Sequence, residues 1–122
     1  MSPQSVQRVA STEILDVEGS LARFGGDEQL FLEMTTMLLE DAPELYSQLE
    51  AAVLRSDAGG VEAKAHAIKG LVANCGGKRA AWAAQVLEDA GHRGDLSNAS
   101  EFAQSLQTEL DILTSAIRTY QQ

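Results

Sequence analysis

Apolar residues recur at helical spacing along most of the chain, and no segment shows the strict alternation of a half-buried strand. The longest such pattern runs from Glu28 to about Arg55 and comprises Leu30, Phe31, Met34, Met37, Leu38, Leu45, Leu49, Ala52 and Val53. Side chains that repeat every three or four residues form one stripe along an α-helix. The pattern therefore predicts a long amphipathic helix and an all-α fold.

Pro43 lies inside this predicted helix. A proline in a helix interior removes one backbone hydrogen bond and costs about 3 kcal/mol. We therefore expect either a kink at Pro43 or two helices that abut there.

Turn and cap signals divide the rest of the chain. In chain order they predict a loose leader over 1–10, a short helix from Asp16 to Gly25, the long helix capped by Asp27, a turn over 56–60, and helices over 61–74, 78–90 and from Asn98 to the end. We expect Gly91 to end the helix over 78–90, and Asn98 with Glu101 to form a capping box. The predicted architecture is an up-down-up-down four-helix bundle with a short extra N-terminal helix, in a single domain over 11–122.

His66 lies in the helix predicted over 61–74. The apolar residues of this segment fall opposite His66 on a helical wheel and are expected to face the core: Val61, Ile68, Leu71, Val72 and Cys75. Mostly small residues lie on the side of His66: Gly59, Glu62, Ala63, Lys69, Gly70 and Ala73. The wheel therefore predicts a solvent-exposed imidazole.

Gly70 is informative because a glycine inside a helix costs about 1 kcal/mol relative to alanine. It lies one turn beyond His66 and leaves room for the imidazole and for a partner that docks over it. Lys69 places an ammonium three residues from His66. An exposed imidazole has an ordinary pKa of about 6.5, so at neutral pH it is substantially neutral and can act as a nucleophile. Phosphoryl transfer mainly needs a placed nucleophile and charge stabilisation, and His66 and Lys69 supply one of each.

The segment His66-Ala67-Ile68-Lys69-Gly70 resembles the His-x-x-Lys-Gly motif of histidine-containing phosphotransfer (HPt) domains. The likeness extends over roughly 14–120 and includes Asp16 to Phe24, the Glu40-Asp41-Ala42-Pro43 stretch and Leu87-Glu88. It implies that His66 takes a phosphoryl group from an aspartate on one receiver domain and gives it to another, as part of a phosphorelay. It also implies that Lys69 supports the phosphoryl charge and that Gly70 provides steric clearance.

The partner that the resemblance implies is a receiver domain of a response regulator or a hybrid histidine kinase. We expect five residues to border its docking site: Glu62, Ala63, Ala73, Gln85 and Glu88. The divalent metal of the reaction is expected in the acidic pocket of the receiver, so no metal site or cofactor is predicted in this chain. His92 at a helix end, Cys75 and Trp82 are expected to have structural roles, with Trp82 in the core or at a helix interface.

Charge and composition exclude several other classes. Nine Lys and Arg against 18 Asp and Glu give a net charge of −9, which disfavours binding to nucleic acid or to an anionic membrane. One cysteine, no signal peptide and no membrane-spanning apolar run lead us to expect a cytoplasmic protein. The apolar stripes can all be buried inside one bundle, so we expect a monomer.

Two other functions are consistent with the same residues. One is the histidine substrate module of a chemotaxis-type kinase, in which an ATP-binding domain elsewhere phosphorylates the histidine. The other is a non-catalytic helical adaptor. The sequence contains no Gly-x-x-x-x-Gly-Lys-Ser/Thr loop, so we expect no ATP-dependent kinase activity of its own.

Overall fold

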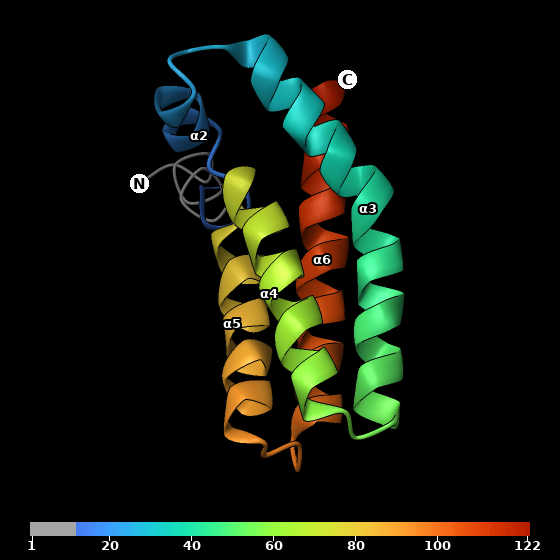
Figure 1. The fold of residues 1–122 in the computed structure, drawn as a ribbon. Coiled ribbons are helices and arrows are strands. Elements are labelled where there is room, and N and C mark those ends of the chain that lie inside the picture. The colour runs from blue at the N-terminus through green and yellow to red at the C-terminus, as the bar shows by residue number, and fades with distance from the viewer. Residues whose placement is uncertain (1–11) are drawn as a thin grey trace, which may run out of the picture.

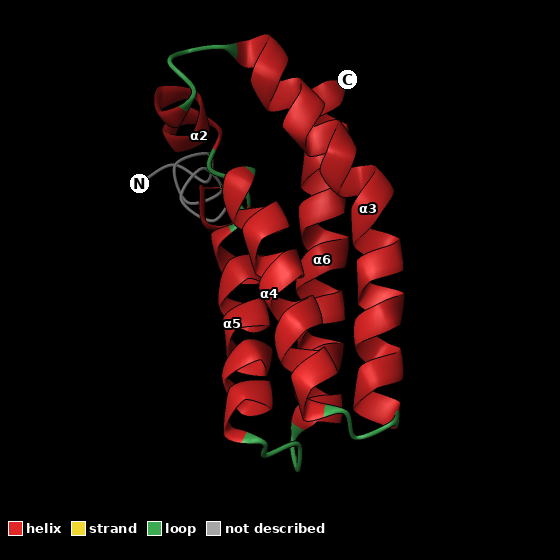
Figure 2. Ribbon diagram, in the orientation of Figure 1, coloured by secondary structure: helices red, strands yellow, loops and turns green. Residues whose placement is uncertain are grey.

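The computed structural model of the chain describes residues 12–122, and over this range it consists of helices and the turns that join them (Figure 2). Four helices form the bundle: α3 (Glu28–Leu54), α4 (Ala58–Asn74), α5 (Lys78–Arg93) and α6 (Ala99–Gln121). Successive helices run in opposite directions (Figure 1). The short α2 (Val17–Arg23) precedes them. The predicted all-α, up-down-up-down architecture is confirmed, whereas the leader predicted over 1–10 lies outside the described residues.

The core is built from aliphatic side chains of all four long helices. Its largest fully buried members include Leu38, Leu49, Ile68, Leu87, Leu106, Leu113 and Ile117. Burying one such side chain stabilises a fold by about 1.5–3 kcal/mol. Phe31 packs edge-to-face on Tyr120 at 5.4 Å between ring centroids, which ties the start of α3 to the end of α6. Cys75 is buried as predicted, and burial raises the pKa of its thiol to about 11.

Aspartate side chains begin three of the helices. Asp16 and Asp27 accept hydrogen bonds from the backbone N–H groups of the third residue after them, which confirms both predicted N-caps. Asp57 does the same for the N–H of Gly60, so α4 begins at Ala58. The prediction of a turn over 56–60 with the helix starting at 61 is therefore wrong for residues 58–60, which are helical. The capping carboxylate draws both glycines of that segment into the first turn.

Pro43 lies inside α3, which is one helix rather than two. Figure 1 shows that the two halves of α3 point in different directions. Pro43 has no N–H to donate to the carbonyl of Leu39, and its ring crowds that carbonyl. Of the two expectations for this position, the kink is correct.

The predicted end of the α5 segment at Gly91 is wrong. The helix continues to Arg93, and Gly94 ends it in the left-handed conformation with φ 71°. Gly91 is buried inside the helix instead, where a Cβ atom would lie 2.6 Å from the backbone nitrogen of Glu62 and 2.8 Å from the carbonyl oxygen of Ala58. Gly91 therefore lets the backbones of α4 and α5 approach closely.

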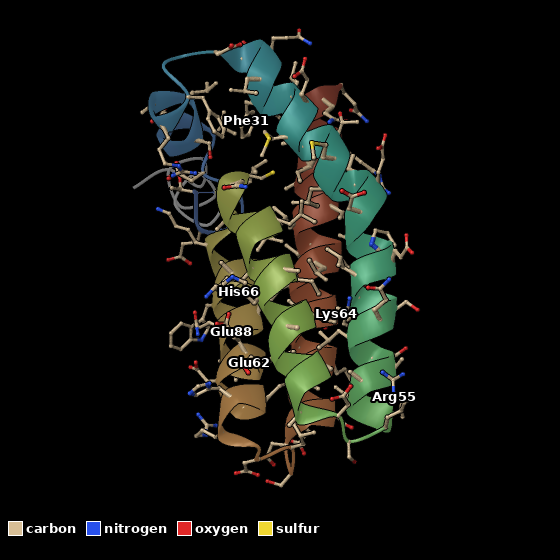
Figure 3. All side chains as sticks on the ribbon, in the orientation of Figure 1. Phe31, Arg55, Glu62, Lys64, His66 and Glu88 are labelled. Carbon is tan, nitrogen blue, oxygen red and sulfur yellow. The ribbon has the colours of Figure 1, made fainter. Side chains whose placement is uncertain are left out.

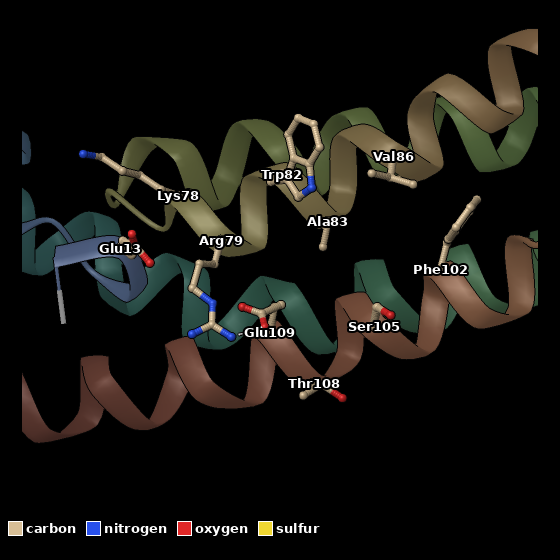
Figure 4. Close-up of a pocket in the computed structure, with 10 residues that line it drawn as sticks. All are labelled: Glu13, Lys78, Arg79, Trp82, Ala83, Val86, Phe102, Ser105, Thr108 and Glu109. Atoms are coloured by element: carbon tan, nitrogen blue, oxygen red, sulfur yellow. Dashed lines mark hydrogen bonds and ion pairs between the residues drawn. The ribbon is translucent and has the colours of Figure 1, made fainter. Parts of the chain in front are cut away.

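Two further sequence predictions fail. Asn98 does precede α6, but its side chain makes no capping hydrogen bond, and its φ and ψ of −112° and 13° lie outside the extended region typical of a capping residue. Trp82 is 71% exposed rather than packed in the core. It borders a groove between α5 and α6 together with Ala83, Val86 and Phe102 (Figure 4). The buried positions of α5 are instead occupied by Ala80, Ala84, Leu87, Ala90 and Gly91. Trp82 lies two residues from both Ala80 and Ala84, and therefore on a different side of the helix.

Gly91 and Gly70 are a matched pair for testing this packing, because both lie inside helices but only Gly91 has neighbours where a Cβ atom would be. We predict that Gly91→Ala lowers the free energy of unfolding by about 1–3 kcal/mol, because backbone atoms must shift to admit the methyl group. Gly70→Ala is expected to raise it by about 0.5–1 kcal/mol, because alanine is the better helix former and no atom is displaced. Urea denaturation followed by circular dichroism measures both, and equal effects of the two substitutions would contradict the close approach of α4 to α5.

Candidate functional site

His66 lies near the middle of α4 with 69% of its side chain exposed. The opposite side of α4 is buried through Val61, Ala65, Ile68 and Val72. This agrees with the helical wheel, except that Leu71 is only half-buried. Figure 3 shows His66 beside Glu88, which projects from α5.

One carboxylate oxygen connects the histidine to the lysine. Oε1 of Glu88 lies 3.2 Å from Nδ1 of His66 and 2.8 Å from Nζ of Lys69. Lys69 also donates a hydrogen bond to Oε1 of Gln85 at 2.9 Å, and Gln85 donates to Oδ1 of Asp89 at 2.8 Å. Because α4 and α5 are antiparallel neighbours, side chains far apart in sequence meet along this seam.

Glu88 is an anion at neutral pH. Its pKa is held below the ordinary value of 4.5, chiefly because Lys69 donates a hydrogen bond to it, and the contact with His66 lowers it further, while partial burial acts in the opposite direction. An ionised carboxylate can only accept hydrogen bonds. In the neutral imidazole the hydrogen therefore resides on Nδ1 of His66, and Nε2 keeps its lone pair.

Gly70 faces open space. A Cβ atom built on it would have no neighbour within 4 Å, and the residue is exposed. Packing inside the described part of the chain therefore does not require a glycine here. The space beside His66 on this side is open to an approaching molecule.

The other residues predicted to border the docking site occupy the same seam or the same face of α4. Glu62 lies on the seam between α4 and α5, where its Oε2 is 2.9 Å from Nδ1 of His92. Ala63 and Ala73 are both exposed. The structure therefore brings His66, Lys69, Gln85 and Glu88 into one connected cluster, with Glu62 one helical turn away.

Arg23 is a neighbour of this face that the sequence does not indicate. Its guanidinium donates hydrogen bonds to the carbonyl of Ala73 and to Oγ of Ser20, both at 3.2 Å. This contact joins α2 to the last turn of α4. Fifty residues separate the two partners, so helical spacing carries no signal for it.

No group of three or more His, Cys, Asp or Glu side chains is arranged to hold a metal ion within residues 12–122. In the same range, no helix is both long enough and apolar enough to cross a membrane.

Comparisons with known proteins identify one family and one similar solved structure. The family model described as Hpt domain matches residues 33–117, which is more than half of the chain and includes all of α4 and α5. The crystal structure of histidine-containing phosphotransfer protein B (HptB) from Pseudomonas aeruginosa PAO1 is similar, with 25% sequence identity and a TM-score of 0.80. The match covers 88% of this chain and 93% of that one. Among curated proteins, no match is found.

The ion pair between Glu88 and Lys69 depends on pH. Because the pKa of Glu88 is lowered, its ion pair with Lys69 is fully present above pH 4.5 and is lost as the pH falls through the lowered pKa. We predict that Lys69→Met raises the Glu88 pKa toward its ordinary value and that His66→Gln raises it less. Carboxyl ¹³C NMR titration measures these shifts, with Asp95, whose pKa is lowered by Ser97, as an internal reference that stays constant. A larger rise in His66→Gln than in Lys69→Met would contradict this order.

Proposed function

Because this chain belongs to the Hpt domain family, which transfers phosphoryl groups through a histidine in phosphorelays, we propose that His66 exchanges phosphoryl groups with receiver domains. It accepts the group from an aspartate on one receiver and passes it to an aspartate on another. The observation that carries this proposal is an exposed imidazole whose Nδ1 is occupied by Glu88. Nε2 has no hydrogen-bond partner among the described residues, so it is free to attack.

The proposed transfer needs no general base from this chain, because Nε2 of the neutral imidazole already carries a lone pair. The lone pair of Nε2 attacks phosphorus, the N–P bond forms, and the P–O bond to the aspartate breaks with its electron pair left on the departing carboxylate. The hydrogen on Nδ1 stays in its contact with Glu88 throughout. Delivery to the second receiver is the same step in reverse. Placement in line and stabilisation of charge are the main contributions a protein makes to such a transfer.

Lys69 is the proposed source of charge stabilisation in this chain. A phosphoryl group on a side chain carries a charge of about −1.5 to −2 at neutral pH. The Lys69 ammonium lies next to His66 through their shared contact with Glu88. We assign the divalent metal of the reaction to the acidic pocket of the receiver.

The proposed docking surface surrounds His66 on α4 and α5. Gly70, Ala63 and Ala73 have little or no side chain, so a receiver can bring its aspartate close to Nε2. Glu62, Gln85 and Glu88 form the polar border of this surface along the seam between the two helices. A single copy of the chain provides all of these residues.

His66→Gln tests the assignment of the nucleophile. We predict that wild-type protein incubated with phosphorylated receiver domains takes up an acid-labile label and that His66→Gln takes up none. His92→Gln is the matched control, because His92 is also exposed and also pairs with a carboxylate across the same seam. It is expected to be labelled like wild type, with circular dichroism confirming that both variants are folded.

The same assay separates the other two functions. Label that appears only when ATP and a kinase ATP-binding domain are supplied would favour a substrate module of a chemotaxis-type kinase. Absence of label under every condition would favour a non-catalytic adaptor. Label retained by His66→Gln would contradict the proposal.

Gly70→Gln tests the approach of the receiver. The longer side chain fits the open space without disturbing the fold, and glutamine is a better helix former than glycine. We predict that transfer from a receiver slows by about a hundredfold, because displacing the reacting groups by about 1 Å costs that much. Direct phosphorylation by phosphoramidate, a small donor that needs no docking surface, is expected to proceed as in wild type. Equal slowing with both donors would show that the substitution damages His66 rather than docking.

A further inference from the structure

Glu88 has two partners but presents one oxygen to both of them. Oε1 accepts the hydrogen bond of Lys69 at 2.8 Å and faces Nδ1 of His66 at 3.2 Å. The Glu88 and Lys69 side chains are only 19% and 27% exposed, so this pair is less accessible to water than His66. In the unphosphorylated protein the positive charge of Lys69 is therefore already paired with the carboxylate of Glu88.

This resting pairing conflicts with the role of Lys69 in the phosphorylated protein. The phosphoryl group bonds to Nε2, whereas Glu88 and its contact with Lys69 lie on the Nδ1 side of the ring. An ammonium is a single point charge, so it cannot give its full attraction to a carboxylate and to a phosphoryl group at the same time. Lys69 must exchange one anion for the other when His66 is phosphorylated.

We propose that Glu88 is a positioning residue that acts through Lys69, by holding the ammonium in the unphosphorylated protein and so competing with the phosphoryl group for it. This inference rests on the proposed function of His66. Its consequence is that Glu88 disfavours the phosphorylated state and makes phosphorylated His66 a better phosphoryl donor.

Glu88→Gln removes the competition with little change in shape. The amide retains an oxygen that accepts the hydrogen bond from Nδ1 of His66, but it no longer holds Lys69 by charge. Lys69 then retains its hydrogen bond to the neutral amide of Gln85, and its charge is available to pair with the phosphoryl group. Because partly exposed ion pairs are worth up to about 1 kcal/mol, we expect the equilibrium to shift toward phosphorylated His66 by about two- to fivefold.

The experiment measures that equilibrium with a small donor. Phosphoramidate and His66 exchange with phosphorylated His66 and ammonia, and ³¹P NMR at a fixed ammonium concentration gives the equilibrium constant. A His92→Gln background leaves His66 as the one histidine of the chain. No receiver takes part, so any effect of Glu88 on docking does not enter the result.

A double-mutant cycle with Lys69→Met identifies the route of the effect. If Glu88 acts through Lys69, Glu88→Gln shifts the equilibrium two- to fivefold when Lys69 is present and leaves it unchanged in Lys69→Met. An equal shift in both backgrounds would mean that the carboxylate repels the phosphoryl group directly, and would overturn the proposal. No shift, or a shift toward the unphosphorylated state, would overturn it as well.

Glu109→Gln is the matched control. Glu109 has a side chain 17% exposed and pairs with Arg79 at 2.7 Å across the seam of α5 with α6. Its substitution removes a comparable carboxylate from α6, which packs on α5 away from His66, and is expected to leave the phosphorylation equilibrium unchanged. Failure of receivers to label wild-type protein would reject the proposed function, whereas the cycle with phosphoramidate would still decide the role of Glu88.

Discussion

The close packing of α4 against α5 is the constraint on which the site depends. Gly91 brings the backbones together, because a Cβ atom there would meet the backbone of Glu62. Packing at this distance fixes how far α5 can slide along α4. Residues at the same level along the two helix axes therefore face each other. His92 meets Glu62, Glu88 meets His66 and Gln85 meets Lys69 in regular succession along one seam. A shift of α5 by one turn would break all three contacts together.

The site therefore divides into a part encoded within one helix and a part encoded between two. The order His66, Lys69, Gly70 places an imidazole, a cation and an open space on one face of α4 by helical spacing alone. Glu88 adds what α4 does not supply. Its carboxylate faces Nδ1 of His66, so the hydrogen of the neutral imidazole lies on that nitrogen, and the same oxygen pairs with Lys69.

This division explains how much the sequence predicts. The apolar period predicts the bundle and the buried side of α4, and Asp16 and Asp27 are recognisable as caps because capping acts over three residues. Gly91 is misassigned because its environment depends on how closely α5 packs on α4, which local spacing does not contain. Trp82 is misassigned because its size and apolar character suggest burial, whereas it lies on a side of α5 away from the buried positions. The contacts of Glu88 with Lys69 and of Arg23 with Ala73 each join two different helices, so local spacing carries no signal for them either.

Gly70 and Gly91 illustrate why a glycine inside a helix has to be explained from its surroundings. Both bear the same local penalty of about 1 kcal/mol relative to alanine. At Gly91 the close packing of two helices offsets that penalty, and a side chain would disturb backbone atoms. At Gly70 nothing in the described part of the chain offsets it, because the space where a side chain would lie is empty. Under the proposed function, the molecule that comes to occupy this space is the receiver domain that docks over His66.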